Sequence, residues 1–127
     1  MNANFEVRCD LDVGIVRCTF GGFLTDSESR DVVGQVTNAM LAVRRRHGRV
    51  LSFFDSRPAA VFSADTIAAL TELRSMYQPQ DRTAVLVATG LRKFQATRNA
   101  SDYTRIFLSE EEAMNWLRNG DDAPGRQ

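Results

Sequence analysis

The segment at residues 49–55, RVLSFFD, constrains the fold more than any other part of this chain. A strand that faces water on one side alternates apolar and polar residues, whereas a strand covered on both faces is apolar at consecutive positions. We therefore expect 49–55 to be a central strand of a sheet that carries layers on both faces. The segment 83–89, TAVLVAT, is also strongly strand-like and predicts a second strand.

The first part of the chain predicts a β-hairpin. Residues 5–10 (FEVRCD) and 15–20 (IVRCTF) alternate apolar with polar positions, and the short stretch LDVG joins them. Cys9 and Cys18 lie on these two strands, which leaves two interpretations. Free cysteines commonly pack as small apolar residues, so we expect reduced packing thiols, with a redox pair as the alternative.

Helices are expected between and after these strands. Thr25 with Glu28 forms a capping box ahead of a helix at 26–46, and Ser109 with Glu112 forms another that begins a helix ending at Gly120. Ser63 is a plausible N-cap for a helix at 64–77, in which Ile67, Leu70 and Leu73 are expected to be buried. A further helix at 90–101 and a last strand at 104–108 complete the expected elements.

The resulting order, β-β-α-β-α-β-α-β-α, predicts an α/β fold. Strands that alternate with helices are joined by right-handed crossovers and form parallel sheets. We expect a single domain at 1–120 with a five-stranded, mostly parallel mixed sheet, an antiparallel opening strand, and helices on both faces. Residues 121–127 (DDAPGRQ) are expected to form a flexible tail.

Charge and hydropathy narrow the function classes. The 127 residues carry 16 basic and 16 acidic side chains, so no global charge favours nucleic acid. No stretch approaches the roughly 18–20 apolar residues of a membrane span, and the first residues lack a signal-peptide pattern, so a cytoplasmic protein without integral membrane association is expected. The basic run at 44–49, RRRHGR, complements the dipole at a helix end. His47 is the sole histidine, and no metal or cofactor is predicted.

Two longer stretches, VLSFFDSRPAAVFSADTIAAL and RTAVLVATGLRKFQATRNASDYTRIFLSEEEAMNWLR, carry a family resemblance. A strand that ends in Asp, a helix start about eight residues later, and a final strand followed by EEEAMNWL resemble the STAS family, whose founding member is the anti-anti-sigma factor SpoIIAA. The second stretch is similar to small bacterial SpoIIAA-like proteins, which resemble both STAS domains and the lipid-binding SEC14 fold. The resemblance covers about residues 5–118.

The resemblance implies a regulatory or interaction site at the start of the second helix. In the switching members of the family, a serine or threonine there is phosphorylated by a partner kinase. The corresponding stretch in this chain is SADT, which has Asp65 where the family has its phosphate acceptor and leaves Ser63 and Thr66 as alternative acceptors. Capping explains Ser63 equally well. Ser63, Asp65 and Thr66 are the predicted interaction or switch residues.

The residues also permit a small-ligand site. Open parallel sheets bind ligands beyond the carboxyl ends of their strands, and free N–H groups at helix starts favour anions. Arg92 and Lys93 fall in the first turn of the helix expected at 90–101, where positive charge opposes the helix dipole. These two side chains therefore bind an anion, point into water or pair with an acidic residue such as Asp55. The predicted anion or ligand residues are Asp55, Ser56, Arg57, Gly90, Arg92 and Lys93.

The sequence therefore favours a non-enzymatic, STAS-like interaction or regulatory module with a protein partner. No base is recognisable beside a nucleophile, as hydrolase or transferase chemistry would require. The alternative is a carrier or sensor of a small anionic or lipid-like ligand. A homodimer is a further expectation left open, through the exposed edge of the short last strand or through helix faces.

Overall fold

The computed structural model describes residues 5–21, 24–57, 64–91, 93 and 103–120, and the remaining residues lie outside this description. The elements are β1 (Phe5–Asp10), β2 (Ile15–Phe20), α1 (Asp26–His47), β3 (Leu51–Asp55), α2 (Ala64–Thr71), the 3₁₀ helix η1 (Glu72–Met76), β4 (Arg82–Leu86), β5 (Thr104–Phe107) and α4 (Glu110–Asn119). Residues 90, 91 and 93 are helical and begin the helix expected at 90–101, whose other residues are not described.

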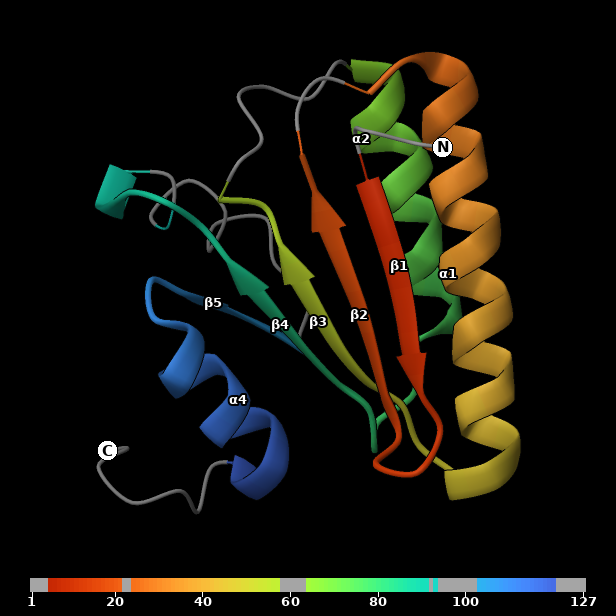
Figure 1. Cartoon of the computed structure of the whole chain (residues 1–127), viewed down its shortest axis with the longest axis vertical. Coiled ribbons are helices and arrows are strands. Elements are labelled where there is room, and N and C mark those ends of the chain that lie inside the picture. Colours follow the sequence, from red (N-terminus) through yellow and green to blue (C-terminus); the bar gives the residue numbers. More distant parts are fainter. Residues whose placement is uncertain (1–4, 22–23, 58–63, 92, 94–102, 121–127) are drawn as a thin grey trace.

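The five strands form one mixed sheet, as predicted. Their order is β1-β2-β3-β4-β5, and only the β1–β2 pair is antiparallel (Figure 1). The strand predicted at 49–55 is β3, and it occupies the central position. Its apolar sequence matches that position, because every residue of β3 is buried.

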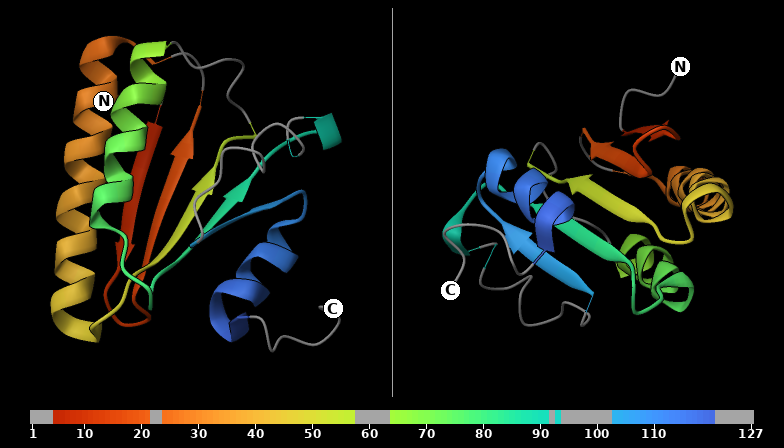
Figure 2. Two further views of the ribbon diagram at one scale, coloured as in Figure 1. Left: turned by 180° about the vertical axis from the view of Figure 1, so that it is seen from behind. Right: turned by 90° about the horizontal axis from the view of Figure 1, so that it is seen from below.

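Helices cover both faces of the sheet, with α1 and α2 on one face and α4 on the other (Figure 2). The strand order explains this distribution. Each parallel step moves to the next strand in the same direction, and right-handed crossovers then place the crossover helices α1 and α2 on one face. Because α4 follows the last strand, it is free to return across the opposite face.

Two apolar cores lie on the two sides of the sheet. On the first side, α1 buries four apolar side chains against β1 and β2, and Phe54 of β3 joins this core. On the second side, Phe53 joins the core that α4 forms with β3 and β4. The α1 residues are Val32, Val36, Met40 and Val43, and the α4 residues are Ala113, Trp116 and Leu117. Adjacent residues of β3 thus serve opposite cores, which explains the continuous apolar run.

The helix expected at 64–77 differs from the structure in two respects. It is α-helical only over Ala64–Thr71 and continues as the 3₁₀ helix Glu72–Met76. The expected burial of Ile67 is wrong, since its side chain is 53% exposed, whereas Leu73 is buried and Leu70 is partly buried. A three-residue spacing turns Ile67 to the margin of the face that packs against α1, so periodicity alone places it too deep.

Several element limits also shift slightly. The strand expected at 83–89 covers Arg82–Leu86, and the last strand covers Thr104–Phe107. The capping box at Thr25 and Glu28 is confirmed, with both of its hydrogen bonds formed. At α4, the Ser109 hydroxyl accepts a hydrogen bond from the Glu112 N–H at 3.3 Å.

The two cysteines are offset across the hairpin. Cys9 lies opposite Val16 and Cys18 lies opposite Val7, so the thiols do not face each other directly. Both are free; Cys18 is fully buried in the first core, and this burial raises its pKa to about 12. Cys18 therefore acts as an apolar packing residue.

No helix among the described residues is long and apolar enough to cross a membrane.

Candidate functional site

The carboxyl end of β3 carries the first three predicted ligand residues. Asp55 is the last residue of β3 and is paired in register with Leu86 of β4, so these strands end at the same edge of the sheet. Ser56 continues this pairing, because its N–H and its hydroxyl both lie near the Leu86 carbonyl, at 2.9 and 3.2 Å. Both Asp55 and Ser56 are buried. The carboxyl ends of β3 and β4 therefore lie side by side at this edge of the sheet.

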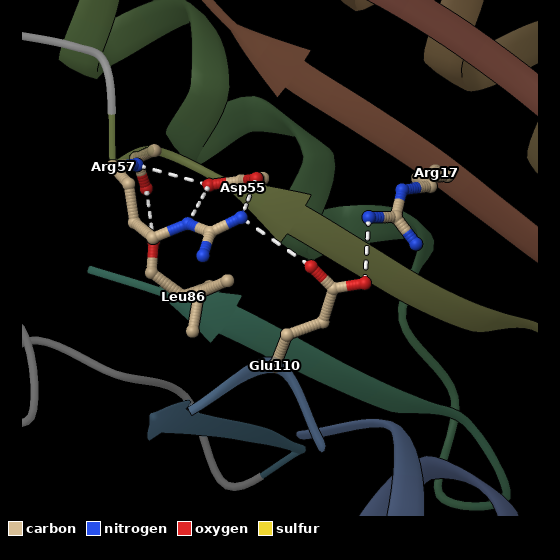
Figure 3. Close-up of polar contacts among 6 residues, drawn as sticks. Arg17, Asp55, Arg57, Leu86 and Glu110 are labelled. Atoms are coloured by element: carbon tan, nitrogen blue, oxygen red, sulfur yellow. Dashed lines mark hydrogen bonds and ion pairs between the residues drawn. The ribbon is translucent and has the colours of Figure 1, made fainter. Parts of the chain in front are cut away.

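Arg57 folds back onto Asp55 and holds both of its oxygens (Figure 3). The guanidinium Nε lies 3.0 Å from Oδ1, and one terminal nitrogen lies 2.8 Å from Oδ2. The Arg57 backbone N–H also donates to Oδ1 at 3.1 Å. Bidentate arginine–carboxylate pairs of this kind are among the stronger hydrogen-bonded contacts in proteins.

A second carboxylate, that of Glu110, connects Arg57 to the helix α4 on the second side of the sheet. Glu110, in the first turn of α4, lies 3.3 Å from the Arg57 guanidinium and 3.1 Å from that of Arg17 on β2. The Arg17 guanidinium also lies 4.5 Å from the centre of the Phe53 ring. We call Asp55, Arg57, Glu110 and Arg17 the ion-pair chain. It alternates in sign, sums to zero and connects β2, β3 and α4 (Figure 3).

The surroundings of Asp55 have opposing effects on its pKa. Burial alone pushes the pKa of this carboxyl upward, but the hydrogen bonds and charge of Arg57, together with the more distant charge of Arg17, outweigh burial and hold the pKa below its usual value. In turn, the Asp55 hydrogen bond raises the pKa of Arg57. Asp55 is therefore an ionised carboxylate at neutral pH, which suits a partner in an ion pair and not a general acid.

These contacts account for Asp55, Ser56 and Arg57 without a ligand. An incoming anion would have to compete with Asp55 and Glu110 for the Arg57 guanidinium. The sheet also lacks the feature that creates ligand crevices in doubly wound folds, because its strand order never reverses. Two independent observations thus weigh against a preformed anion site at this strand end.

The predicted ligand residues after β4 are described only in part. Gly90 begins a helical turn in which the Lys93 N–H donates to the Thr89 carbonyl at 3.0 Å, and the Lys93 side chain is exposed. A Cβ at Gly90 would meet nothing within 4 Å, so no close backbone approach requires this glycine. Arg92 lies outside the described residues.

The predicted interaction residues lie at the start of α2. Asp65 and Thr66 fall in its first turn, although their side chains are not described, and Ser63 lies outside the described residues. Ile67 follows directly and exposes 53% of its surface. An exposed apolar residue, Ile67, therefore follows Asp65 and Thr66 directly in α2.

Sequence reasoning missed Arg17 and Glu110. A weak signal for Arg17 is its charge at an otherwise apolar stretch of β2, on the side that also carries the buried Ile15. Together with Glu6, Arg8 and Thr19, Arg17 lines a shallow open groove of about 390 Å³ on the sheet. We call this charged surface of β1 and β2 the open half-face, since α4 packs on the other half of the same face, over β3, β4 and β5.

Side chains of the basic run at 44–49 contact other segments of the fold. Arg44 pairs with Asp81 at 2.8 Å, Arg46 lies 3.4 Å from Asp12, and the His47 ring Nε2 lies 2.6 Å from the Leu11 carbonyl oxygen. These contacts connect the end of α1 to the β1–β2 turn and to the segment before β4. Within the described part of the chain, no group of three or more His, Cys, Asp or Glu side chains is arranged to hold a metal ion.

The ion-pair chain predicts a specific acid titration. Since the folded pKa of Asp55 lies below its unfolded value of about 3.9, ionised Asp55 stabilises the fold above that value, and this contribution is lost as pH falls through the folded pKa. Replacing Arg57 with methionine removes the main opposing effect and leaves burial, so the pKa of Asp55 is expected to rise. Carbon-detected NMR titration of the Asp55 carboxyl measures this change.

The control for this titration is Arg8→Met. Arg8 lies on the same side of the sheet but pairs with Glu6, so its removal is expected to leave the Asp55 titration in place. An unchanged Asp55 pKa in Arg57→Met would show that Arg57 does not hold this carboxylate.

Comparison with known proteins agrees with this architecture. No family model matches the chain, and a search of curated proteins finds no significant match. Among solved structures, the chain is similar to an uncharacterized protein of the DUF3478 family with a SpoIIAA-like fold from Shewanella loihica PV-4. The TM-score is 0.66 at 15% sequence identity, over 92% of this chain and 98% of that chain. The chain therefore has a SpoIIAA-like, STAS-like fold, as the sequence resemblance implied.

Proposed function

We propose that this chain is a non-enzymatic, cytoplasmic interaction or regulatory module that binds a protein partner through the start of α2. The contact surface consists of Asp65, Thr66 and Ile67, with Ser63 immediately before the helix. The observation that carries the proposal is the 53% exposure of Ile67 beside the positions that the family resemblance selects. Complete burial of such a side chain against a partner is worth roughly 1.5–3 kcal/mol.

The arrangement of α2 supports this proposal. Leu73 is buried in the first core and Leu70 packs against it, so these residues attach α2 to the rest of the molecule. Ile67 contributes less to that attachment, and it leaves an apolar contact point beside Asp65 and Thr66. An apolar side chain among polar neighbours is a usual composition for a protein-binding surface.

The contacts of Arg57 favour this proposal over the ligand carrier. A carrier of an anionic head group needs a cation that the fold leaves available, whereas Arg57 is shared between Asp55 and Glu110. The open half-face beside it is lined by charged and polar residues, whereas sites for lipid-like molecules are mainly apolar.

The position of the single histidine also supports a non-enzymatic role. His47 contacts Leu11 near the amino end of β2, and Asp55 lies at the carboxyl end of the parallel strand β3. These groups therefore lie at opposite ends of the sheet and do not form an acid–base pair.

Phosphorylation at Ser63 or Thr66 stays a prediction of the family resemblance. A phosphate on Thr66 would add negative charge to the first turn of α2, where the helix dipole favours it, and would change the surface that a partner reads. Phosphopeptide mass spectrometry of the protein from its source organism tests this regulation. Absence of modification under all growth conditions would remove the switch but not the binding surface.

The test of partner binding uses one charge placed on the proposed surface. The tagged protein is produced from its own locus, cross-linked in cells and purified, with Ile67→Glu compared to wild type. We expect at least about a tenfold loss of the bound partner, because the variant removes apolar contact and buries a charge.

The matched control is Leu41→Glu. Leu41 is 45% exposed on α1, so the same change is made at an apolar surface residue of another helix. Circular dichroism melting checks that both variants fold. Recovery of the same proteins with wild type and both variants would contradict the proposed surface, and recovery of no partner with wild type would contradict the proposed function.

A further inference from the structure

The edge strand β1 carries a pattern of charged side chains that plays no part in the proposed function. Among the described strands, β1 is the end of the sheet and pairs only with β2 on its inner side. Its six residues exceed the four of β5, the other end strand. A long unpaired strand margin is a template for pairing with another chain.

The residues of β1 are complementary to themselves in antiparallel order. Glu6 and Arg8 flank Val7 and lie on the open half-face, where their side chains are 59% and 73% exposed. Phe5 and Val7 of β1 pack in the first core on the other side. The strand therefore carries opposite charges at equal distances from a central apolar residue.

We propose that β1 pairs with β1 of a second copy in an antiparallel, two-fold arrangement centred on Val7. Each residue at a given distance before Val7 then faces the residue at the same distance after Val7 in the other copy. Glu6 lies opposite Arg8 twice, on one side of the joined sheet, and Phe5 lies opposite Cys9 on the other. Opposite-charge pairs across antiparallel strands stabilise pairing by about 0.2–1 kcal/mol each.

Other registers are less favourable. Directly opposed residues in antiparallel strands point to the same face, so a two-fold axis through the sheet must pass through a residue position. A centre at Arg8 places Arg8 against Arg8 and Glu6 against Asp10, and a centre at Glu6 places Glu6 against itself. A centre at Cys9 pairs only three residues within β1, and Asp10 already accepts hydrogen bonds from the turn.

The proposed pairing is closed. Both copies use the same free edge of β1, so after pairing neither copy has a free β1 edge to which a third copy could add. The product is therefore a dimer and not a fibre. The open half-faces of both copies become one continuous surface across the two-fold axis. The pairing does not involve Ile67, so it is independent of the proposed partner surface on α2.

Charge reversal tests this pairing by sedimentation velocity over a concentration series. Wild type is expected to be dimeric at high concentration. Either Glu6→Arg or Arg8→Glu alone replaces two favourable pairs with two like-charge pairs, so we expect the dissociation constant to rise at least about tenfold. The double variant Glu6→Arg/Arg8→Glu restores complementarity and is expected to return to the wild-type dissociation constant.

A second measurement fixes the register. In a Cys9→Ser background, Val7→Cys places two thiols at the two-fold axis, where opposed Cα atoms lie within disulfide range. Mild oxidation is expected to produce a covalent dimer, whereas Val13→Cys on the exposed turn is the control. A monomeric wild type at all concentrations, a dissociation constant in both single reversals equal to that of wild type, or equal cross-linking at positions 7 and 13 would overturn the proposal.

Discussion

Replacing Asp81 with alanine is expected to lower the free energy of unfolding by about 3–5 kcal/mol, because it removes the buried partner of a largely buried ion pair. The Asp81 side chain is only 2% exposed. Its two oxygens accept hydrogen bonds from both terminal nitrogens of Arg44, at 3.1 and 2.8 Å, and from the backbone N–H groups of Val50 and Gln78. Few positions in the described part of the chain join so many segments.

The loss would reach beyond the ion pair itself. Asp81 precedes β4, Arg44 belongs to the last turns of α1, and Val50 directly precedes β3. Without the carboxylate, Arg44 keeps its bond to the Met76 carbonyl but loses its counter-charge, and the buried N–H of Val50 and the part-buried N–H of Gln78 lose their acceptor. Unpaired buried groups of this kind carry the full cost of leaving water.

Urea unfolding at pH 7 measures the effect, and Asp12→Ala is the matched control. Asp12 also forms an ion pair with a residue of α1, Arg46, but its side chain is 89% exposed and the contact is 3.4 Å. Exposed pairs contribute at most about 1 kcal/mol. Similar losses in the two variants would contradict the role assigned to Asp81.

Replacing Leu117 with alanine is expected to cost about 3 kcal/mol, within the range of buried leucine truncations. Leu117 is fully buried in α4 and belongs to the core on the second side of the sheet, together with Phe53 and Leu86. The cavity would lie between α4 and the central strands. Because α4 also positions Glu110, the truncation is expected to weaken the contacts of the ion-pair chain as well.

The control is Leu108→Ala, a leucine two residues before α4 that is 47% exposed. Its truncation removes the same atoms from a site that is already half in water, so the expected loss is below about 1 kcal/mol. Chemical unfolding of both variants gives the comparison. Equal losses would mean that α4 does not cover the sheet as described.

Sequence reasoning predicted the layers well where one local pattern determines the outcome. The consecutive apolar residues of β3 require cover on both faces, and the structure supplies it through Phe53 on one side and Phe54 on the other. The Thr25 and Glu28 pair defines a helix start through contacts only three residues apart. These signals depend on residues that are close in the sequence, so the corresponding elements can be predicted without knowledge of the fold.

The remaining features depend on contacts between distant residues. Arg17 and Glu110 are 93 positions apart, and Arg44 and Asp81 are 37 apart, so no spacing rule links them. The exposure of Ile67 depends on how α2 is rotated about its own axis against α1. The spacing of apolar residues predicts that rotation only to within about one residue position. For the same reason the sequence suggested Arg57 for an anion, whereas its guanidinium is held by two carboxylates of the chain itself.

Whether the Arg57 guanidinium at the end of β3 is available to an anion can be measured directly. In a ¹H–¹⁵N NMR titration with inorganic phosphate, and separately with phosphatidylglycerol vesicles, we expect no saturable shift at the amides of Asp55, Arg57 and Glu110, because Arg57 is already paired. Saturable shifts at these three residues with either probe would show that Arg57 binds anions and would assign this end of the sheet to a carrier of anionic ligands.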